Sequence, residues 1–315
     1  MADMKKIATR DAYGKALAEL GAEHEDLIVF DADLSNATKT NTCKKAFPER
    51  HFNCGIAEGN MIAVAAGLST MGLVPFVSSF AMFAVGRAFE QVRNSIGYPH
   101  LNVKIGGTHG GISVGEDCAS HQCCEDVALM RSIPGRVVMS PADDVEARAM
   151  VKAAYEHQGP VYMRFSRWAV PVVHDEASFT FEIGKGEVIQ DGTDVAIIAN
   201  GLMVGESIEA GKLLAEKGIS ARIIDMATIK PLDEELVLKA ARECGKIVTV
   251  EEHSVIGGLG EAVCALLSEK CPVPVKRIGV NDEFGHSGPA GALLKQFGLC
   301  ADNIAEQTLA LLGRK

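Results

Sequence analysis

The chain has 315 residues, of which 47% are hydrophobic and 32 are glycine, enough to bury a sizeable core and to suggest more than one domain. The formal net charge is −10 and no run is rich in lysine or arginine, which argues against nucleic acid or an anionic membrane as a partner. No stretch reaches the ~18 consecutive apolar residues of a membrane span, and the nine cysteines form no C-x-x-C pair, so we expect reduced thiols in a cytoplasmic protein.

Strand-like and helix-like segments alternate as far as residue 165. The expected strands are unbroken apolar runs, and each is followed by a longer segment with helical spacing of its apolar residues. In chain order we expect strand 27–30, helix 61–68, strand 74–77, helix 81–96, strand 103–105, helix 126–131, strand 137–139, helix 145–157 and strand 161–165. This alternation predicts a mostly parallel sheet covered by helices on both faces.

A polar stretch with turn signals, residues 169–194, interrupts the pattern. The alternation resumes with strand 195–199, helix 204–217, strand 221–224, helix 234–244, strand 247–250, helix 258–267, strand 275–278 and two closing helices. We therefore predict an α/β protein with two domains, residues 1–173 and 194–315, joined by a linker at 174–193.

Glu58 is the single charged residue of the apolar stretch 52–72, and the next charge along the chain is Arg87. A buried carboxylate must find a partner or take up a proton. The simpler interpretation is a carboxylate stabilised by a helix N-terminus, and the alternative is a functional acid. Spacing alone favours the simpler interpretation, so the surrounding residues have to decide.

Ligands of open parallel sheets gather beyond the carboxyl ends of the strands, so the glycine-rich segment after strand 103–105 is a candidate binding loop. Its glycines let the backbone approach a ligand closely. Within thirteen residues the segment contains two histidines and two acids, a set suited to hydroxyl and phosphate groups: His109, Glu116, Asp117 and His121.

Aromatic and basic residues follow other expected strands. Phe80 and Phe83 begin the segment after strand 74–77, where core packing is the simpler interpretation. Three arginines could hold a phosphate or could be solvated surface charges: Arg10, Arg164 and Arg167.

A metal site is a competing interpretation for one cysteine-rich cluster: Cys118, His121, Cys123 and Cys124. Zinc sites usually combine paired ligands from two separate places, whereas this is one cluster with two adjacent cysteines. We therefore expect small packing groups there and assign no metal ligand.

Taken together, several stretches resemble the C-terminal half of transketolase, in the form where that enzyme is split between two chains. The stretches are IATRDAYGKAL, FDADLSN, GIAEGNMIAVAAGL, PFVSSFAMF, THGGISVGEDCASHQCCEDVALMRSIPG, GPVYMRFSR, DMATIKPLD and VEEHSVIGGLG. Their order and spacing make the resemblance specific, and it covers nearly the whole chain. It implies a pyrimidine-binding domain of thiamine-diphosphate enzymes followed by a transketolase C-terminal domain.

The resemblance gives Glu58 a catalytic role. The matching glutamate of the family hydrogen-bonds a ring nitrogen of the cofactor's aminopyrimidine, which helps to generate a nucleophilic thiazolium carbon. A carboxyl group at the edge of an apolar site is expected to stay protonated near neutrality. The resemblance also places Phe83 flat against the aminopyrimidine, Phe80 beside it, and the acid Asp33 near the cofactor.

For the substrate, the resemblance implies two groups of contacts. The residues that match positions holding the substrate phosphate are Arg10, Ser35, His109 and Arg167. Asp117 and His121 match positions that contact the sugar hydroxyls near the reacting carbon, and His121 is expected to act in catalysis with Glu58. Gly86 stands where the family has a tyrosine, and the loop around Ser35 is shorter than in single-chain transketolases.

A missing motif is equally informative. The family binds the diphosphate through Mg²⁺ held by a GDG motif, and no GDG occurs in this sequence. The chain is therefore expected to hold the pyrimidine half of the site and to be inactive alone. We expect an N-terminal subunit carrying the GDG motif as its partner, in a heterotetramer of two chains of each type that acts on phosphorylated sugars.

Alternatives remain within and outside this chemistry. A 1-deoxyxylulose-5-phosphate synthase and the beta subunit of a 2-oxo-acid dehydrogenase share the two-domain plan, but HQCCEDVALMRSIPG and GIAEGNM are more similar to transketolase. A non-catalytic regulatory paralogue and an unrelated metal-binding module are the alternatives from other classes. The presence of Glu58 argues against the regulatory paralogue.

Overall fold

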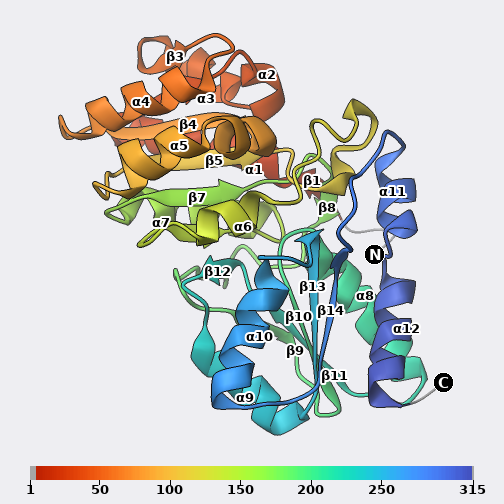
Figure 1. The fold of residues 1–315 in the computed structure, drawn as a ribbon. Helices are drawn as coiled ribbons and strands as arrows, with labels where there is room; N and C mark the ends of the chain where they lie inside the picture. Colours follow the sequence, from red (N-terminus) through yellow and green to blue (C-terminus); the bar gives the residue numbers. More distant parts are fainter. Residues whose placement is uncertain (1–4, 314–315) are drawn as a thin grey trace.

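The computed structural model describes residues 5–313, and it contains two α/β domains that lie one above the other in Figure 1. The first domain has the elements β1 (Lys6–Ala8), α1 (Thr9–Glu23), β2 (Leu27–Asp31), α2 (Ser35–Thr38), α3 (Asn41–Ala46), η1 (Pro48–Arg50), β3 (His51–Asn53), α4 (Glu58–Ser69), β4 (Val74–Phe80), η2 (Met82–Arg87), α5 (Phe89–Gln91), η3 (Val92–Gly97), β5 (Lys104–Thr108), η4 (Ile112–Asp117), α6 (Asp126–Arg131), β6 (Val137–Met139), α7 (Asp144–Glu156), β7 (Val161–Arg164) and β8 (Ala169–Pro171).

The second domain follows the same plan. Its elements are β9 (Glu187–Gln190), β10 (Val195–Ala199), α8 (Met203–Glu216), β11 (Ala221–Asp225), β12 (Thr228–Lys230), α9 (Glu234–Cys244), β13 (Ile247–Ser254), α10 (Leu259–Lys270), β14 (Val275–Val280), α11 (Ala290–Gln296) and α12 (Ala301–Leu312).

Two mostly parallel sheets confirm the predicted α/β class. The first has the order β12-β6-β7-β5-β4-β2-β3 and the second the order β14-β13-β10-β11-β9. Each sheet has one antiparallel edge strand, β12 and β9 respectively. Because β12 comes from the second domain and pairs with β6, the second domain contributes a strand to the sheet of the first and fixes the domains against each other.

Apolar residues on both faces of the strands bury both sheets. In β2, Ile28 and Phe30 face the core beneath α4, while Leu27 and Val29 face the core beneath α1 and α7. The core on the α4 side continues across the domain boundary to α9 and α10. A separate core packs α8 and α12 against the outer face of the second sheet.

Several elements differ from the sequence expectation. The strand β1 and helix α1 were not predicted, although α1 buries Ala12, Tyr13 and Leu17. The continuous helix expected over 81–96 is divided by two π-helical segments, η2 and η3. The strand β9 falls inside the stretch expected to connect the domains and pairs with β11.

No helix of the described part of the chain is long and apolar enough to span a membrane. All nine cysteines are free.

Candidate active site

The residues expected to form a site gather at the carboxyl ends of neighbouring strands of the first sheet. These strands lie side by side in the order β7, β5, β4, β2 and β3. Arg167 follows β7, and His109 follows β5. Phe80 ends β4, and Phe83 comes just after it. Asp33 and Ser35 follow β2, and Glu58 begins the helix after β3. Segments from 33 to 167 are therefore brought to one edge, as expected for a ligand site in a parallel sheet.

Glu58 finds a partner in Arg87. The side chain of Glu58 is 2% exposed and begins α4, and its two carboxylate oxygens lie 3.1 and 3.2 Å from Nη1 of Arg87. Of the two possibilities for a buried carboxylate, a partner or a proton, the structure shows the partner. In the sequence Arg87 is the next charge after Glu58, but no pattern predicted a role for it.

An aromatic wall lies beside this ion pair. The rings of Phe80 and Phe83 are stacked with their centroids 5.8 Å apart, and Phe83 is only half-buried. The guanidinium carbon of Arg87 lies 4.8 Å from the centroid of Phe83, as in a cation–π contact. The core-packing interpretation thus describes the buried Phe80, whereas Phe83 is half-buried and has the partly exposed Arg87 side chain over its ring.

His109 is a buried, neutral histidine. Its ring stacks on Phe80 at 3.7 Å, Nδ1 lies 2.9 Å from Thr108 Oγ1, and Nε2 lies 2.9 Å from Nη1 of Arg10. Because a guanidinium only donates, Nε2 accepts this hydrogen bond and Nδ1 carries the proton. Burial, reinforced by the positive charges of Arg10 and Arg167, lowers the pKa of His109 to about 3.

The two arginines reach this place from distant segments. Arg10, at the start of α1, donates from Nη1 to Ala37 O at 3.1 Å, and its buried Nε has no hydrogen-bond partner. Arg167 donates to Val114 O and lies 3.3 Å from Glu116 Oε2. Two guanidinium groups close enough to act on the same histidine, one with an unused buried donor, suit an anion.

His121 and Asp117 lie at the open side of the aromatic wall. The edge of His121 faces Phe83 at a centroid distance of 5.2 Å and Phe80 at 6.0 Å. Asp117 is exposed, and its charge acts on Arg10, whose pKa is lowered mainly by burial. Both residues thus lie within reach of a ligand that also contacts the phenylalanines and the arginines.

Asp31, a residue that the sequence reading missed, holds the loop with Ser35 and Asp33. Its buried carboxylate accepts hydrogen bonds from Leu34 N, from Thr38 Oγ1 at 2.7 Å and from Thr40 Oγ1 at 3.0 Å. Burial raises the pKa of Asp31 despite these donors.

In that loop, Ser35 begins α2, and Asp33 is exposed with a positive φ of 64°. The Oδ1 atom of Asp33 accepts from Asn53 Nδ2 at 3.0 Å. Asp33 is therefore tied to the end of β3, the strand that leads to Glu58, and within residues 5–313 it forms no ion pair.

Arg164 is a structural residue, which excludes the surface-charge interpretation. It is 7% exposed, Nε lies 2.8 Å from Asp126 Oδ2, and Nη2 donates to Glu252 O in the second domain at 2.8 Å. Buried charges of this kind require such partners. Arg164 therefore joins the two domains and does not face a ligand.

The second domain also positions the glycine-rich loop. The carboxylate of Glu252, in β13, accepts from Ser113 N at 2.5 Å. A Cβ atom at Gly111, where φ is +89°, would lie 2.4 Å from this side chain, so the contact requires a glycine. Nothing local to the loop in the sequence indicates this contact, because the residues are 139 positions apart.

Two further expectations concern Gly86 and the cysteines. A Cβ atom at Gly86 would lie 2.2 Å from Met82 Cε, so Met82 fills the space next to the position where the resemblance gives a tyrosine.

Cys123 and Cys124 are buried, and burial raises the pKa of both thiols. Over residues 5–313 the cysteine cluster does not form a group of three converging metal ligands, so the zinc alternative is not supported.

Comparisons with known proteins identify the family of the chain. The transketolase pyrimidine-binding domain matches residues 5–172, and the transketolase C-terminal domain matches residues 184–304. The chain belongs to the transketolase family.

Among its transketolase relatives, a protein of Methanocaldococcus jannaschii named as a transketolase C-terminal section is 51% identical over 302 residues and covers 95% of both chains. A solved structure described as a split-gene transketolase, inactive beta4 tetramer, is 54% identical with a TM-score of 0.91, and covers 98% of this chain and 99% of that one. The 1-deoxy-D-xylulose-5-phosphate synthase 1 of Geobacter sulfurreducens is 39% identical, and the alignment covers 96% of this chain but 48% of that one.

Proposed function

We propose that this chain is the C-terminal subunit of a thiamine-diphosphate-dependent transketolase. Paired with an N-terminal subunit, it transfers a two-carbon ketol unit from a ketose phosphate to an aldose phosphate. The observation that carries the proposal is the convergence of Glu58, Phe83 and His109 at one edge of the sheet, in a chain without a GDG motif.

The residues present fit the pyrimidine half of the cofactor. The guanidinium of Arg87 bridges Glu58 and the ring face of Phe83, at 3.1 Å and 4.8 Å. A guanidinium is a flat group of donors, so the same space suits a flat heteroaromatic ring that stacks on Phe83 and offers a nitrogen to Glu58. The side chain of Arg87 is 54% exposed, and it is therefore the member of the pair that can withdraw.

Thiamine diphosphate, when bound, supplies a nucleophilic thiazolium carbon. The role of Glu58 is to hold a proton against a ring nitrogen of the pyrimidine. Once Arg87 has withdrawn, the carboxyl group of Glu58, whose side chain is 2% exposed, is left with the ring nitrogen as its partner. Phe83 fixes the plane of the ring, Phe80 supports it, and Asp33 lies beside the strand that leads to Glu58.

The substrate phosphate is assigned to Arg10, Arg167, His109 and Ser35. The unused Nε donor of Arg10 supports an anion there, and neutral His109 orients Arg10 by accepting its hydrogen bond. Asp117 and His121 are assigned to the sugar hydroxyls, with His121 as the group that moves a proton near the reacting carbon.

The diphosphate and its Mg²⁺ are assigned to a partner. Among residues 5–313, no group of three converging acids or other metal ligands includes Glu58, and the GDG motif is absent. The relatives named as a C-terminal section and a split-gene transketolase support an N-terminal partner that carries the motif. We expect a heterotetramer of two chains of each type, in the cytoplasm, where nine free cysteines stay reduced.

Co-expression with a GDG-bearing subunit tests the function. The purified complex should transfer a ketol unit from xylulose 5-phosphate to ribose 5-phosphate. Activity with pyruvate and glyceraldehyde 3-phosphate instead would assign the chain to the 1-deoxyxylulose-5-phosphate synthase type. A stable complex without either activity would support the regulatory paralogue and contradict the proposal.

A second measurement tests the division of the site. Calorimetric titration of the isolated chain with thiamine diphosphate and Mg²⁺ should detect negligible binding, because this chain lacks the diphosphate-holding half. The complex should bind the cofactor under the same conditions. Micromolar binding and ketol transfer by the isolated chain would contradict the two-chain proposal.

A further inference from the structure

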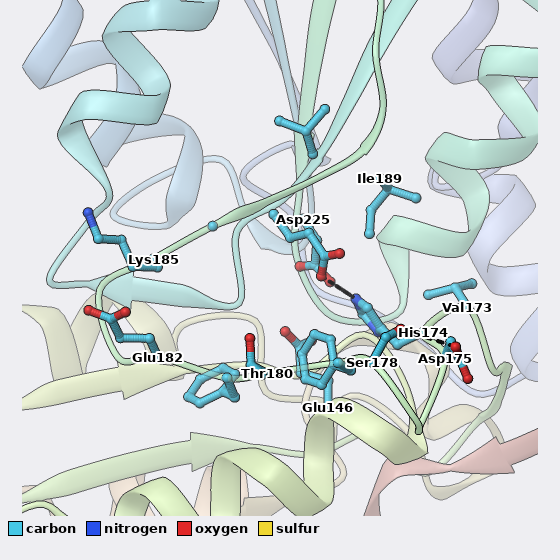
Figure 2. A pocket seen from close by; sticks show the side chains of 15 residues that line it. Glu146, Val173, His174, Asp175, Ser178, Thr180, Glu182, Lys185, Ile189 and Asp225 are labelled. Carbon is cyan, nitrogen blue, oxygen red and sulfur yellow. Dashed lines mark hydrogen bonds and ion pairs between the residues drawn. The ribbon is translucent and has the colours of Figure 1, made fainter.

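A pocket of about 510 Å³ lies between the domains and holds a buried group of ionisable side chains. Glu146 comes from the first turn of α7, Asp225 ends β11, and His174 lies in the segment between β8 and β9. One ligand atom of each lies within 4.8 Å of the others. Figure 2 shows His174 and Asp225 pointing toward each other above Glu146. We refer to these three residues as the interdomain cluster.

Asp225 is the residue of the interdomain cluster that most needs a positively charged partner. The residue is 2% exposed, and over residues 5–313 no backbone or amide donor reaches its carboxylate oxygens, whose close polar neighbour is another carboxyl group, that of Glu146. Its nearest cation-forming group is His174, with Nε2 at 3.7 Å from Oδ2. A buried carboxylate without partners is costly, so it is normally paired, protonated or bound to a metal.

The histidine is held as a metal-binding histidine usually is. Nδ1 of His174 lies 3.1 Å from Asp143 Oδ2, although the alignment is not that of a hydrogen bond. The same Oδ2 atom accepts from the backbone N–H groups of Val173 and His174, at 2.7 and 2.8 Å. Asp143 is thus held behind Nδ1, and Nε2 is the ring nitrogen that faces Glu187 and Asp225.

The distances suit a small divalent ion. Ligand atoms at ~2.0–2.2 Å from a tetrahedral ion lie roughly 3.3–3.6 Å apart. Nε2 of His174 lies 3.7 Å from Asp225 Oδ2 and 3.3 Å from Oε2 of Glu187, whose side chain is 52% exposed at the mouth of the pocket. Glu146 Oε2 accepts from Ala142 N at 2.7 Å, and the Glu146 carboxyl group also lies within hydrogen-bonding reach of the Asp225 carboxyl group.

Charge points the same way. Four carboxylates surround one imidazole: Asp143, Glu146, Glu187 and Asp225. Even a protonated His174 leaves an excess of negative charge, and three of the four carboxylates are buried. The cluster therefore takes up positive charge, as protons or as a cation.

We propose that Glu146, His174 and Asp225 bind a divalent transition metal ion of the zinc class, with Glu187 or water at the open position. One imidazole and carboxylates form a mixed N,O set, which favours such ions over Mg²⁺. Because the ligands come from both domains and the segment between them, the ion links the two domains.

Co²⁺ is the first probe, since its spectrum reports the ligands without any variant. Full-length chain treated with a chelator and kept in excess Mg²⁺ should give saturable visible d–d absorption with Co²⁺, without a thiolate charge-transfer band. Zn²⁺ should displace Co²⁺, and at about a hundredfold excess over its Kd should raise the melting temperature by roughly 5 °C. A thiolate band, or no saturable spectrum, overturns the proposal.

Matched variants locate the site. His174→Gln and Asp225→Asn should each weaken Zn²⁺ binding by at least about a hundredfold in calorimetry, since even the loss of a supporting residue behind a metal ligand costs 10- to 100-fold. Glu182→Gln, an exposed residue of the same pocket, should bind like the wild type. The substitution Asp225→Asn changes the side-chain shape little. If His174→Gln does not fold, Asp225→Asn is therefore the variant that tests the site. Equal affinity in the wild type and Asp225→Asn overturns the proposal and leaves protons as what neutralises the cluster.

Discussion

Arg87 and Glu58 form an unequal pair: the arginine side chain is 54% exposed, while the glutamate is 2% exposed. Both carboxylate oxygens lie within 3.2 Å of one guanidinium nitrogen, and the same guanidinium covers the face of Phe83. The arginine can turn into solvent, whereas Glu58 is fixed at the start of α4. The pair therefore neutralises the buried carboxylate in the isolated chain and can open for a ligand.

A double-mutant cycle should measure this pair. We expect Glu58→Gln and Arg87→Gln to show a coupling of about 1 kcal/mol in the free energy of unfolding of the isolated chain. The value lies below that of a fully buried pair because water screens the exposed arginine. Urea denaturation of the four proteins gives the coupling. Single effects that add to within ~0.3 kcal/mol would mean that the contact contributes nothing.

Glu58→Gln should also lower turnover of the reconstituted complex by about two orders of magnitude, while cofactor binding stays largely intact. Glutamine keeps the shape and cannot hold the transferable proton, and acid–base contributions are typically of this size. Steady-state ketol-transfer kinetics provide the measurement. Glu90→Gln, an exposed carboxylate close by in sequence, serves as the control and should leave turnover unchanged. Near-wild-type turnover of Glu58→Gln would remove this residue from the mechanism.

The sequence was sufficient for the fold class because its strands are short apolar runs with clear boundaries. Residues 195–199, for example, are β10 at the predicted position, buried throughout. The helix α1 was missed because its buried face mixes small residues with Tyr13, Leu17 and Leu20, which gives only weak periodicity of large apolar residues. The π-helical segments were missed because apolar spacing does not distinguish them from an ordinary helix.

The site was harder to predict, since its decisive contacts are distant in sequence. Glu58 and Arg87 are 29 residues apart, and Arg10 and His109 are 99 apart. Arg164 and Arg167 are the same residue type three positions apart, so the sequence does not distinguish them. The packing of the second domain is what encloses Arg164. Local patterns therefore predicted which strand ends carry the polar residues but not which of them pair.

Arg167→Ala should raise the KM for phosphorylated sugars roughly ten- to a hundredfold and leave the KM for hydroxypyruvate nearly unchanged. A lost charge-assisted contact to phosphate costs ~1.5–3 kcal/mol. Hydroxypyruvate has no phosphate group, so its binding does not depend on this contact. Initial-rate kinetics of the complex with both donors make the comparison. Equal losses for the two donors would mean that Arg167 is structural.

The control for Arg167 must be an arginine outside the site and the core. Arg164 is unsuitable, because breaking its buried pair with Asp126 should cost ~3–5 kcal/mol of stability. Arg242, exposed in α9 of the second domain, is suitable. Arg242→Ala should leave both KM values at their wild-type level.

His109 should make the stability of the isolated chain depend on pH. Its pKa falls from an ordinary value of 6.5 to about 3 on folding, so between these values the unfolded chain binds more protons than the folded one. The free energy of unfolding therefore rises with pH across this window, by up to ~1.4 kcal/mol per pH unit, and the contribution is complete above about pH 6.5.

The variant His109→Gln lacks this titration. Urea denaturation should thus show a difference between wild type and variant that grows from about pH 4.5 to about pH 6.5 and is then constant, while His286→Gln, at an exposed histidine, follows the wild type. A difference that does not change with pH would mean that His109 is protonated in the folded chain, and would contradict the neutral ring that accepts a hydrogen bond from Arg10.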